Sequence, residues 1–160
     1  MELLAPVAYQ AAAEKLFQSV CIDVLRLLPH ARVEHIGSSA IPGALSKGDV
    51  DLCVMVGKGQ VPAASRLLKK LGYVEKQDTL QTTQLCMLVS EHKNIDVALQ
   101  VIEVGSEFEF FVSFRDALLA DPVLVHNYND VKMAAAHLSD DAYREAKSQF
   151  IEGVLLGLRS

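Results

Sequence analysis

Residues 33–56, VEHIGSSAIPGALSKGDVDLCVMV, constrain the fold more than any other stretch of the chain. The segment VDLCVMVG has the valine-rich character of a buried strand, and the preceding RVEHIG is typical of a second strand. The loop between them contains Gly37, Gly43, Gly48 and Pro42, and two carboxylates open the second strand. The pattern therefore predicts a sheet in which flexible backbone and acidic side chains meet at neighbouring strand ends.

The rest of the chain alternates between helical and extended patterns. Near the N-terminus, apolar residues recur at helical spacing between Pro6, which suits a first helical turn, and Pro29, which ends the pattern. We expect helices over 6–28, 61–73 and 107–120, extended stretches over 79–90 and 95–104, and a hairpin loop over 91–94. Asp121-Pro122 and Ser139 are expected to begin two further helices. This order favours an α+β fold, with a small mixed sheet, helices packed on it and a helical C-terminal region.

Length and composition bound the class of protein. With 160 residues, 51% of them hydrophobic, we expect one domain over 1–160, divided into a sheet core with its N-terminal helix over 1–105 and C-terminal helices over 106–160. The net charge of −5 argues against a general nucleic-acid binder, although a few placed lysines can still bind phosphate locally.

Several absences favour a cytoplasmic protein. The start, MELLAPVAYQ, lacks the basic and long apolar regions of a signal peptide. No stretch approaches the apolar length of a membrane span, so no membrane association is expected. Cys21, Cys53 and Cys86 follow no CxxC spacing, which predicts reduced, packed thiols.

Asp49 and Asp51 are two residues apart on the second strand. On extended backbone their side chains leave the same face, about 6–7 Å apart along the strand. Two carboxylates on one face repel each other unless a cation lies between them, and Mg²⁺ prefers such hard oxygen ligands. The alternative is that one aspartate caps a turn while the other lies at a strand edge.

Gly37 and Ser38 follow the first strand directly. A glycine lets another group approach the backbone, and exposed N–H groups in such a turn form an anion nest. An ordinary tight turn is the alternative, but the turn and the acidic pair together could hold a metal-chelated triphosphate. A third carboxylate is then expected on an adjacent strand, and Asp96, which opens the apolar segment IDVALQVIEV, is the candidate. Asp96 could instead be a strand-start aspartate exposed to water.

These motifs resemble those of a known family. A Gly-Ser pair, a spacer of about ten residues, Asp-x-Asp and a later strand aspartate are similar to the nucleotidyltransferase superfamily signature. HIGSSAIPGALSK resembles the H-I-G-S-T/S-x-x-P-G-x-x-x-K signature of the GrpB family within that superfamily. FRDALLADPVLVHNYNDVK and YREAKSQFI are similar to the family's C-terminal F-R-D, Y-x-x-x-K and K-x-x-F-I patterns, so the resemblance covers about residues 30–155.

The resemblance implies a nucleotidyltransferase-like fold and a nucleotide site at Gly37, Ser38, Asp49, Asp51 and Asp96. The family's reaction is not implied, because its substrate is poorly established. Where the commonest family pattern has K-P-I-I-D, this chain has Lys-Gly-Asp-Val-Asp, which restores the first aspartate of the superfamily and favours metal chemistry.

Five further residues are candidates for phosphate binding, each with a structural alternative. They are His35, Lys47, Arg115, Lys132 and Lys147. His35 could bind phosphate, position the loop or be a satisfied core histidine. Lys132 and Lys147 each lie four residues after a tyrosine and share a helix face with it, so they could offset a triphosphate or extend along an amphipathic helix. Arg115 could clamp a phosphate or form an ion pair that holds its helix to the sheet, and Lys47 could be a solvated loop lysine.

These observations lead to a hypothesis and two rivals. The first is a nucleotidyltransferase, dependent on Mg²⁺ or Mn²⁺, that transfers a nucleoside monophosphate from a nucleoside triphosphate to an unidentified acceptor. Asp49 and Asp51 would hold the metal, and Asp96 would complete the metal site or act as general base. The rivals are a nucleotide-binding or regulatory module without turnover, and a structural protein whose acidic cluster binds only cations. A nucleic-acid partner is not expected.

Overall fold

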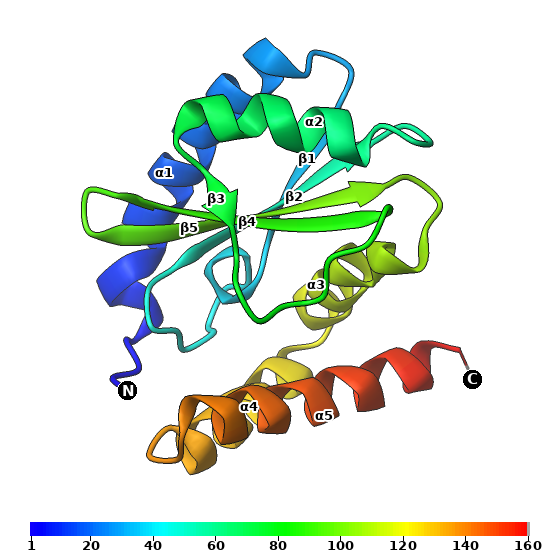
Figure 1. The fold of residues 1–160 in the computed structure, drawn as a ribbon. Helices are drawn as coiled ribbons and strands as arrows, with labels where there is room; N and C mark the ends of the chain where they lie inside the picture. The colour runs from blue at the N-terminus through cyan, green and yellow to red at the C-terminus, as the bar shows by residue number, and fades with distance from the viewer. Residues whose placement is uncertain (160) are drawn as a thin grey trace.

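The computed structural model describes residues 1–159 and contains a five-stranded mixed sheet with the strand order β1-β2-β5-β4-β3 (Figure 1). The strands are β1 (Arg32–Ile36), β2 (Val50–Val56), β3 (Val74–Glu75), β4 (Leu85–His92) and β5 (Ile95–Glu103). The α-helices are α1 (Pro6–Leu27), α2 (Val61–Leu68), α3 (Phe110–Ala120), α4 (Pro122–Ala135) and α5 (Asp140–Leu158), with single 3₁₀ turns at η1 (Ser38–Ala40), η2 (Lys69–Leu71) and η3 (Glu107–Glu109). This architecture confirms the predicted α+β class and the helical C-terminal region.

β2 and β5 run parallel at the centre of the sheet, and the other neighbouring strands pair antiparallel. β4 and β5 form the predicted hairpin, whose turn uses positive φ angles at Lys93 and Asn94. Two details differ from the sequence prediction. The short edge strand β3 was not predicted, since two residues give no periodic pattern, and β4 begins only at Leu85 because residues 79–84 form an irregular connection.

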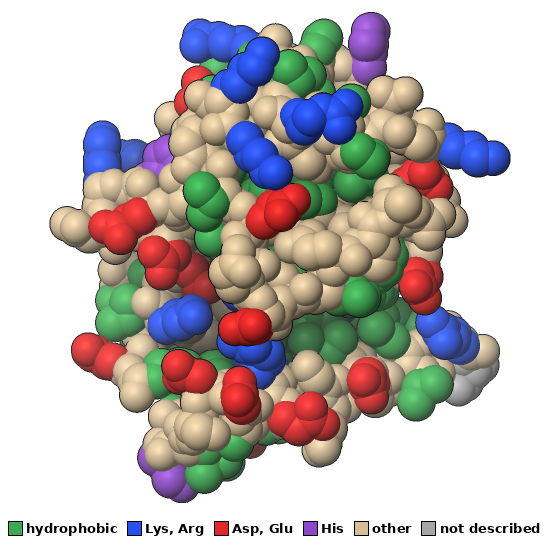
Figure 2. All heavy atoms as spheres, in the orientation of Figure 1, with side chains coloured by type: hydrophobic (Ala, Val, Ile, Leu, Met, Phe, Trp, Pro, Cys, Tyr) green, Lys and Arg blue, Asp and Glu red, His purple; other side chains and the backbone are tan. Residues whose placement is uncertain are grey.

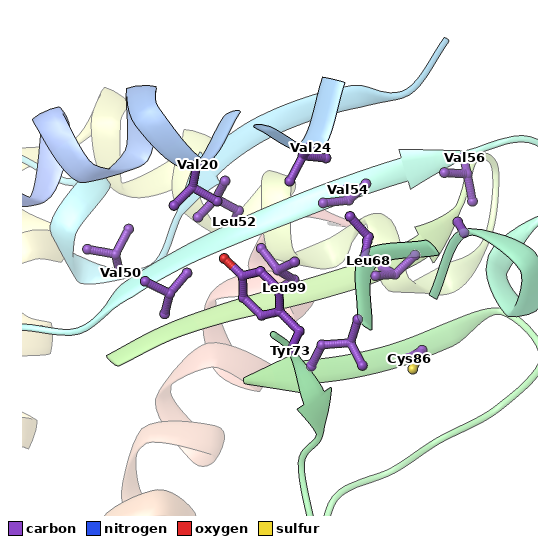
Figure 3. Close-up of a cluster of buried hydrophobic side chains, with 14 of the residues drawn as sticks. Val20, Val24, Val50, Leu52, Val54, Val56, Leu68, Tyr73, Cys86 and Leu99 are labelled. Carbon is purple, nitrogen blue, oxygen red and sulfur yellow. The ribbon is translucent and has the colours of Figure 1, made fainter. Parts of the chain in front are cut away.

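One face of the sheet is closed by α1 and α2. The valines and leucines of β2 and β5 alternate onto this face and pack against Val20 and Val24 of α1 and Leu68 of α2 (Figure 3). Val24, Leu52, Leu68 and Leu99 are fully buried in this cluster. Because alternate residues of a strand point to the same side of the sheet, these apolar side chains share one face. The closed face therefore contains the main apolar core.

The C-terminal helices cover the opposite face of the sheet, but their side chains pack directly on only part of it. Near the C-terminal ends of β2 and β5, Cys53, Met55 and Ile102 pack against Phe108 of η3 and Val112 of α3. α4 and α5 run alongside each other and form a separate cluster with α3 and the loop after β1 (Figure 1). The N-terminal ends of β2 and β5 consequently border a cleft.

The predicted helix starts in the C-terminal region are confirmed. The Asp121 side chain accepts a hydrogen bond from the Val123 N–H, and Ser139 accepts one from the Ala142 N–H. The three cysteines are free thiols. Within residues 1–159, no helix is long and apolar enough to cross a membrane.

Candidate nucleotide site

The turn after β1 and the acidic start of β2 lie against each other. Ile36, the last residue of β1, pairs with Asp51 in the antiparallel register. Gly37 then adopts a positive φ of 73°, and a Cβ built on it would collide with the Asp51 carboxylate. Glycine is therefore required here twice, by its backbone conformation and by the close approach of Asp51.

Asp49 and Asp51 carry the negative charge of the site. Asp49 accepts a hydrogen bond from the Ser46 hydroxyl at 3.4 Å, and the Lys47 ammonium lies 3.9 Å from its Oδ2. Burial, together with the neighbouring Asp49 carboxylate, raises the pKa of Asp51 to about 7, while Lys147, Lys47 and Lys76 act in the opposite direction. Such a carboxylate is held at a cost, which a bound cation would reduce.

Lys132 of α4 is the most deeply buried cation of this region, with 2% of its surface exposed. Its ammonium donates hydrogen bonds to the Ser38 hydroxyl and to the Leu45 carbonyl (2.6 Å), and lies 4.1 Å from the centre of the Tyr128 ring. Burial and the nearby Lys147 lower the pKa of Lys132 to about 7, although Asp49 and Asp51 favour its charged form. Lys132 thus ties the Gly37-Ser38 turn to the C-terminal helices.

Lys147 of α5 faces the same space. Its ammonium lies 4.8 Å from the centre of the Tyr143 ring, and burial lowers its pKa against the attraction of Asp49. The two lysines, the turn and the acidic pair enclose a cavity of about 90 Å³, which we call the turn cavity. Its lining residues are Gly37, Ser38, Ser46, Lys47, Asp49, Asp51, Tyr128, Lys132, Tyr143 and Lys147.

Asp96 lies on the other side of the acidic pair. It precedes Val97, the partner of Val50, and it shares the open sheet face with Ala98, the partner of Asp51. With Asp49 and Asp51 it lines a larger cavity of about 620 Å³, which we call the β5 cavity and which adjoins the turn cavity at the acidic pair. The β5 cavity is lined by Lys47, Asp49, Asp51, Gly72, Val74, Lys76, Val89, Ser90, Glu91, Asp96, Val97, Ala98, Gln100 and Arg144.

The three aspartates share one cavity, but they do not form a closed cluster. Asp96 is exposed, and across residues 1–159 no group of three His, Cys, Asp or Glu side chains is close enough to hold a metal ion. In this structure Asp49, Asp51 and Asp96 thus share a cavity without forming a ready-made three-carboxylate metal site, and the role of Asp96 in holding the metal stays a prediction. The donors that fit a cation here are the adjacent Asp49 and Asp51 carboxylates, and Asp96 would have to approach them.

His35 is placed away from both cavities. It lies on the closed face, where its Nδ1 is 3.0 Å from Glu14 of α1 and its Nε2 is 2.8 Å from the Ser39 hydroxyl. Its ring stacks on Phe17, and burial lowers its pKa. His35 is thus a satisfied core histidine that positions the turn through Ser39, and its assignment to phosphate binding is corrected.

Arg115 is likewise occupied elsewhere. Its guanidinium donates to Glu34 (3.0 Å) and to the His35 carbonyl (2.9 Å), and it also pairs with Asp116. These bonds fasten α3 to β1, so the ion-pair alternative holds and the phosphate-clamp assignment is corrected. Lys47 borders both cavities but is exposed, with its nearest carboxylate at Asp49.

Three residues that support the loop were not singled out from the sequence. The Tyr9 hydroxyl donates to the Ala44 carbonyl at 2.8 Å, and Ser46 holds the Gly48 N–H as well as Asp49. Asn129 of α4 accepts from the Leu45 N–H and donates to the Gly43 carbonyl. Asn129 precedes Lys132 by three residues and so shares its helix face. This spacing could have identified Asn129 from the sequence.

Solved structures show the same fold. The chain superposes on GrpB from Enterococcus faecalis with a TM-score of 0.78 and 20% identity, covering 99% of this chain and 100% of the other. It also matches the Cid1 poly(U) polymerase, in a structure with bound MgGTP, with a TM-score of 0.58 and 18% identity. That match covers 79% of this chain and 42% of the polymerase. The fold is therefore nucleotidyltransferase-like, as the resemblance implied.

Sequence comparisons identify closer relatives. A UPF0157 protein of Vibrio cholerae is 49% identical over 147 residues, which cover 92% of this chain and 78% of the relative. A UPF0157 protein of Deinococcus radiodurans is 33% identical over 130 residues, covering 80% and 68%. The family model described as GrpB protein matches residues 5–156. The chain therefore belongs to the GrpB family.

Proposed function

We propose that the protein is a metal-dependent nucleotidyltransferase that transfers a nucleoside monophosphate from a nucleoside triphosphate to an acceptor. The observation that carries the proposal is the turn cavity, where the paired carboxylates Asp49 and Asp51 lie between the Gly37-Ser38 turn and two lysines, Lys132 and Lys147, of which the first is buried and the second half-buried. A fold shared with a polymerase whose structure holds MgGTP supports it. We place the activity in the cytoplasm.

The chain's own residues have distinct roles in this proposal. Lys132 and Lys147 offset the charge of the triphosphate, and the turn at Gly37 and Ser38 binds its phosphate oxygens through backbone N–H groups. Because Lys132 already holds the Ser38 hydroxyl, the turn is oriented before the nucleotide arrives. Asp49 and Asp51 would hold Mg²⁺ or Mn²⁺, which neutralises phosphate charge and makes an acceptor hydroxyl more acidic.

In the reaction, an acceptor hydroxyl oxygen forms a bond to the α-phosphorus. The bond from that phosphorus to the oxygen bridging the α- and β-phosphates breaks, and pyrophosphate leaves with the electron pair. Asp96, exposed at the edge of the β5 cavity, takes the hydroxyl proton on its carboxylate in this proposal.

The alternative of a nucleotide-binding or regulatory module rests on one observation. Asp96 stands apart from Asp49 and Asp51, and residues 1–159 contain no ready-made three-carboxylate group. Such a module would bind the triphosphate with the metal but would not release pyrophosphate.

Pyrophosphate release separates the two functions. The protein is incubated with each of the four nucleoside triphosphates and Mg²⁺ or Mn²⁺, with a small-molecule cell extract as the source of acceptors. We expect release from at least one triphosphate, dependent on the metal and on extract, and its loss in Asp51→Asn. Triphosphate binding without any release would favour the module, and the absence of both would overturn the proposed function.

A further inference from the structure

Gln100 is a buried polar residue whose side-chain oxygen forms no hydrogen bond within the described part of the fold. It lies on β5 between Cys53 of β2 and Met87 of β4, with 6% of its surface exposed. Its side-chain oxygen is buried and has no hydrogen-bond partner among residues 1–159. A buried amide oxygen without a hydrogen-bond partner costs stability, so an apolar residue would suit this central position better.

The Gln100 side chain also lines the β5 cavity. It shares the open sheet face with Asp96 and Ala98, because alternate residues of a strand point to the same side. Rotation of the amide about its last torsion would turn the buried oxygen toward the cavity, where a ligand would reach it. That ligand must present a hydrogen-bond donor.

Besides Lys47, two cations border the same cavity. Lys76 is partly buried and Arg144 of α5 is exposed, and neither forms an ion pair with a carboxylate in the part of the chain that the structure describes. Basic and acidic side chains lie close together around the hollow between the sheet and the C-terminal helices (Figure 2). The cations suit an anionic group, while Asp96 suits a hydroxyl.

The volume of the β5 cavity, about 620 Å³, lies within the range of small-molecule sites. The turn cavity, at about 90 Å³, accommodates far less, and the acidic pair separates the two. Two ligands could thus approach Asp49 and Asp51 from opposite sides.

We propose that the β5 cavity binds the acceptor, that this acceptor is a small hydroxyl-bearing phosphate ester, and that Gln100 is its specificity-determining residue. Lys76 and Arg144 bind the phosphate, Gln100 accepts a hydrogen bond from a donor group of the acceptor, and its hydroxyl lies toward Asp96. This inference rests on the proposed function for the reaction, but it predicts binding that is measurable without turnover.

Binding of three probes tests the inference. Ribose 5-phosphate, adenosine 5′-monophosphate and gluconate are titrated calorimetrically into the full chain, alone and with saturating Mg²⁺ and a non-hydrolysable triphosphate analogue. We expect a phosphate ester to bind and gluconate not to bind, which distinguishes a phosphate from a carboxylate. Because the cavities are separate, the analogue should not compete with the probe.

Matched variants identify the residues. Arg144→Gln and Gln100→Met should each weaken probe binding about tenfold, with affinity for the analogue unchanged. Gln100→Met should also raise stability, which shows that the variant folds. Lys58→Gln removes an exposed lysine outside the cavity and should leave probe binding intact.

Three results would overturn the inference: no phosphate probe binds at millimolar concentration, the analogue displaces the probe competitively, or Gln100→Met leaves probe affinity unchanged. The analogue titration reports separately on the proposed function. If the analogue binds with Mg²⁺ and the probes do not, the nucleotide site stands and only the acceptor assignment fails.

Discussion

The two faces of β2 present different kinds of side chain. The residues that alternate onto the closed face are Val50, Leu52, Val54 and Val56, and those on the open face are Asp51, Cys53 and Met55. Every closed-face side chain is apolar and buried against α1 and α2, and the first three are fully buried. The open face is apolar only where α3 covers it, and it becomes acidic where it borders the two cavities.

This difference indicates how each face affects the stability of the fold. Burial of the closed-face side chains stabilises the fold through the hydrophobic effect. Asp51 on the open face costs stability in the empty protein, since burial and Asp49 both disfavour its charge. Substitution of a buried apolar residue on the closed face should therefore lower the free energy of unfolding, whereas substitution of Asp51 should leave it unchanged or raise it.

The largest effect is expected on the closed face. Leu52→Ala should reduce the free energy of unfolding by about 2–5 kcal/mol, because it leaves a cavity in the fully buried cluster. Urea denaturation measures the change. Leu80→Ala, at a leucine that is 60% exposed, is the control and should change stability by less than about 0.5 kcal/mol. Equal losses for the two variants would show that the closed face is not the main core.

A smaller loss is expected where the turn meets the acidic pair. Gly37→Ala should cost about 1–3 kcal/mol, because alanine disfavours the positive φ. Gly59 has nearly the same φ, 74° against 73°, but open space around its Cβ position. Gly59→Ala therefore measures the cost of a positive φ without a nearby side chain, and the excess loss in Gly37→Ala measures the contact with Asp51 together with the extended ψ of −175° at Gly37. If thermal or urea unfolding gives the same loss for both, Asp51 does not press against the turn in solution.

The pH dependence of stability sharpens the comparison on the open face. The pKa of Asp51 is raised from 3.8 to about 7, so between these values the folded state holds a proton that the unfolded state has lost. Its contribution to stability therefore falls as pH rises through this range. The pKa of Lys132 is lowered from 10.5 to about 7, so its contribution rises as pH increases from about 7.

Urea titrations between pH 4 and 10, without divalent cations, measure both trends. Asp51→Asn should remove the falling part below pH 7, and Lys132→Met should remove the rising part above it. Stability curves that run parallel for the three proteins would show that neither group has a shifted pKa.

The sequence predicted some parts of the molecule better than others, and the closed face was among the parts that it predicted well. Alternating valines and helical spacing are local signals, so the closed-face strands, the long helices and the caps at Asp121 and Ser139 were predictable. Helical spacing to a tyrosine also singled out Lys132 and Lys147 as candidates to offset a triphosphate, and the structure places both in one cavity with Asp49 and Asp51.

The errors concern contacts between distant segments. His35 and Arg115 have the chemistry to bind phosphate, but Glu14, Ser39 and Glu34 already occupy them. Those partners come from α1, the turn and β1, and no local pattern reveals them. Gln100 was missed for the same reason, since a glutamine within an apolar run signals a site only when its cavity is known.

The central claim, that the open face is built for a metal-bound triphosphate, is tested most directly by Asp51→Asn. We measure urea stability without metal, and the rise in melting temperature caused by Mg²⁺ with each nucleoside triphosphate, for both proteins. The empty variant should be as stable as the natural protein or more stable by up to about 2 kcal/mol, because it removes a buried charge and its repulsion with Asp49. Its melting temperature should no longer rise with Mg²⁺ and triphosphate, since a neutral amide holds the metal poorly. A clear loss of stability in Asp51→Asn, with the response to Mg²⁺ and triphosphate unchanged, would contradict the claim.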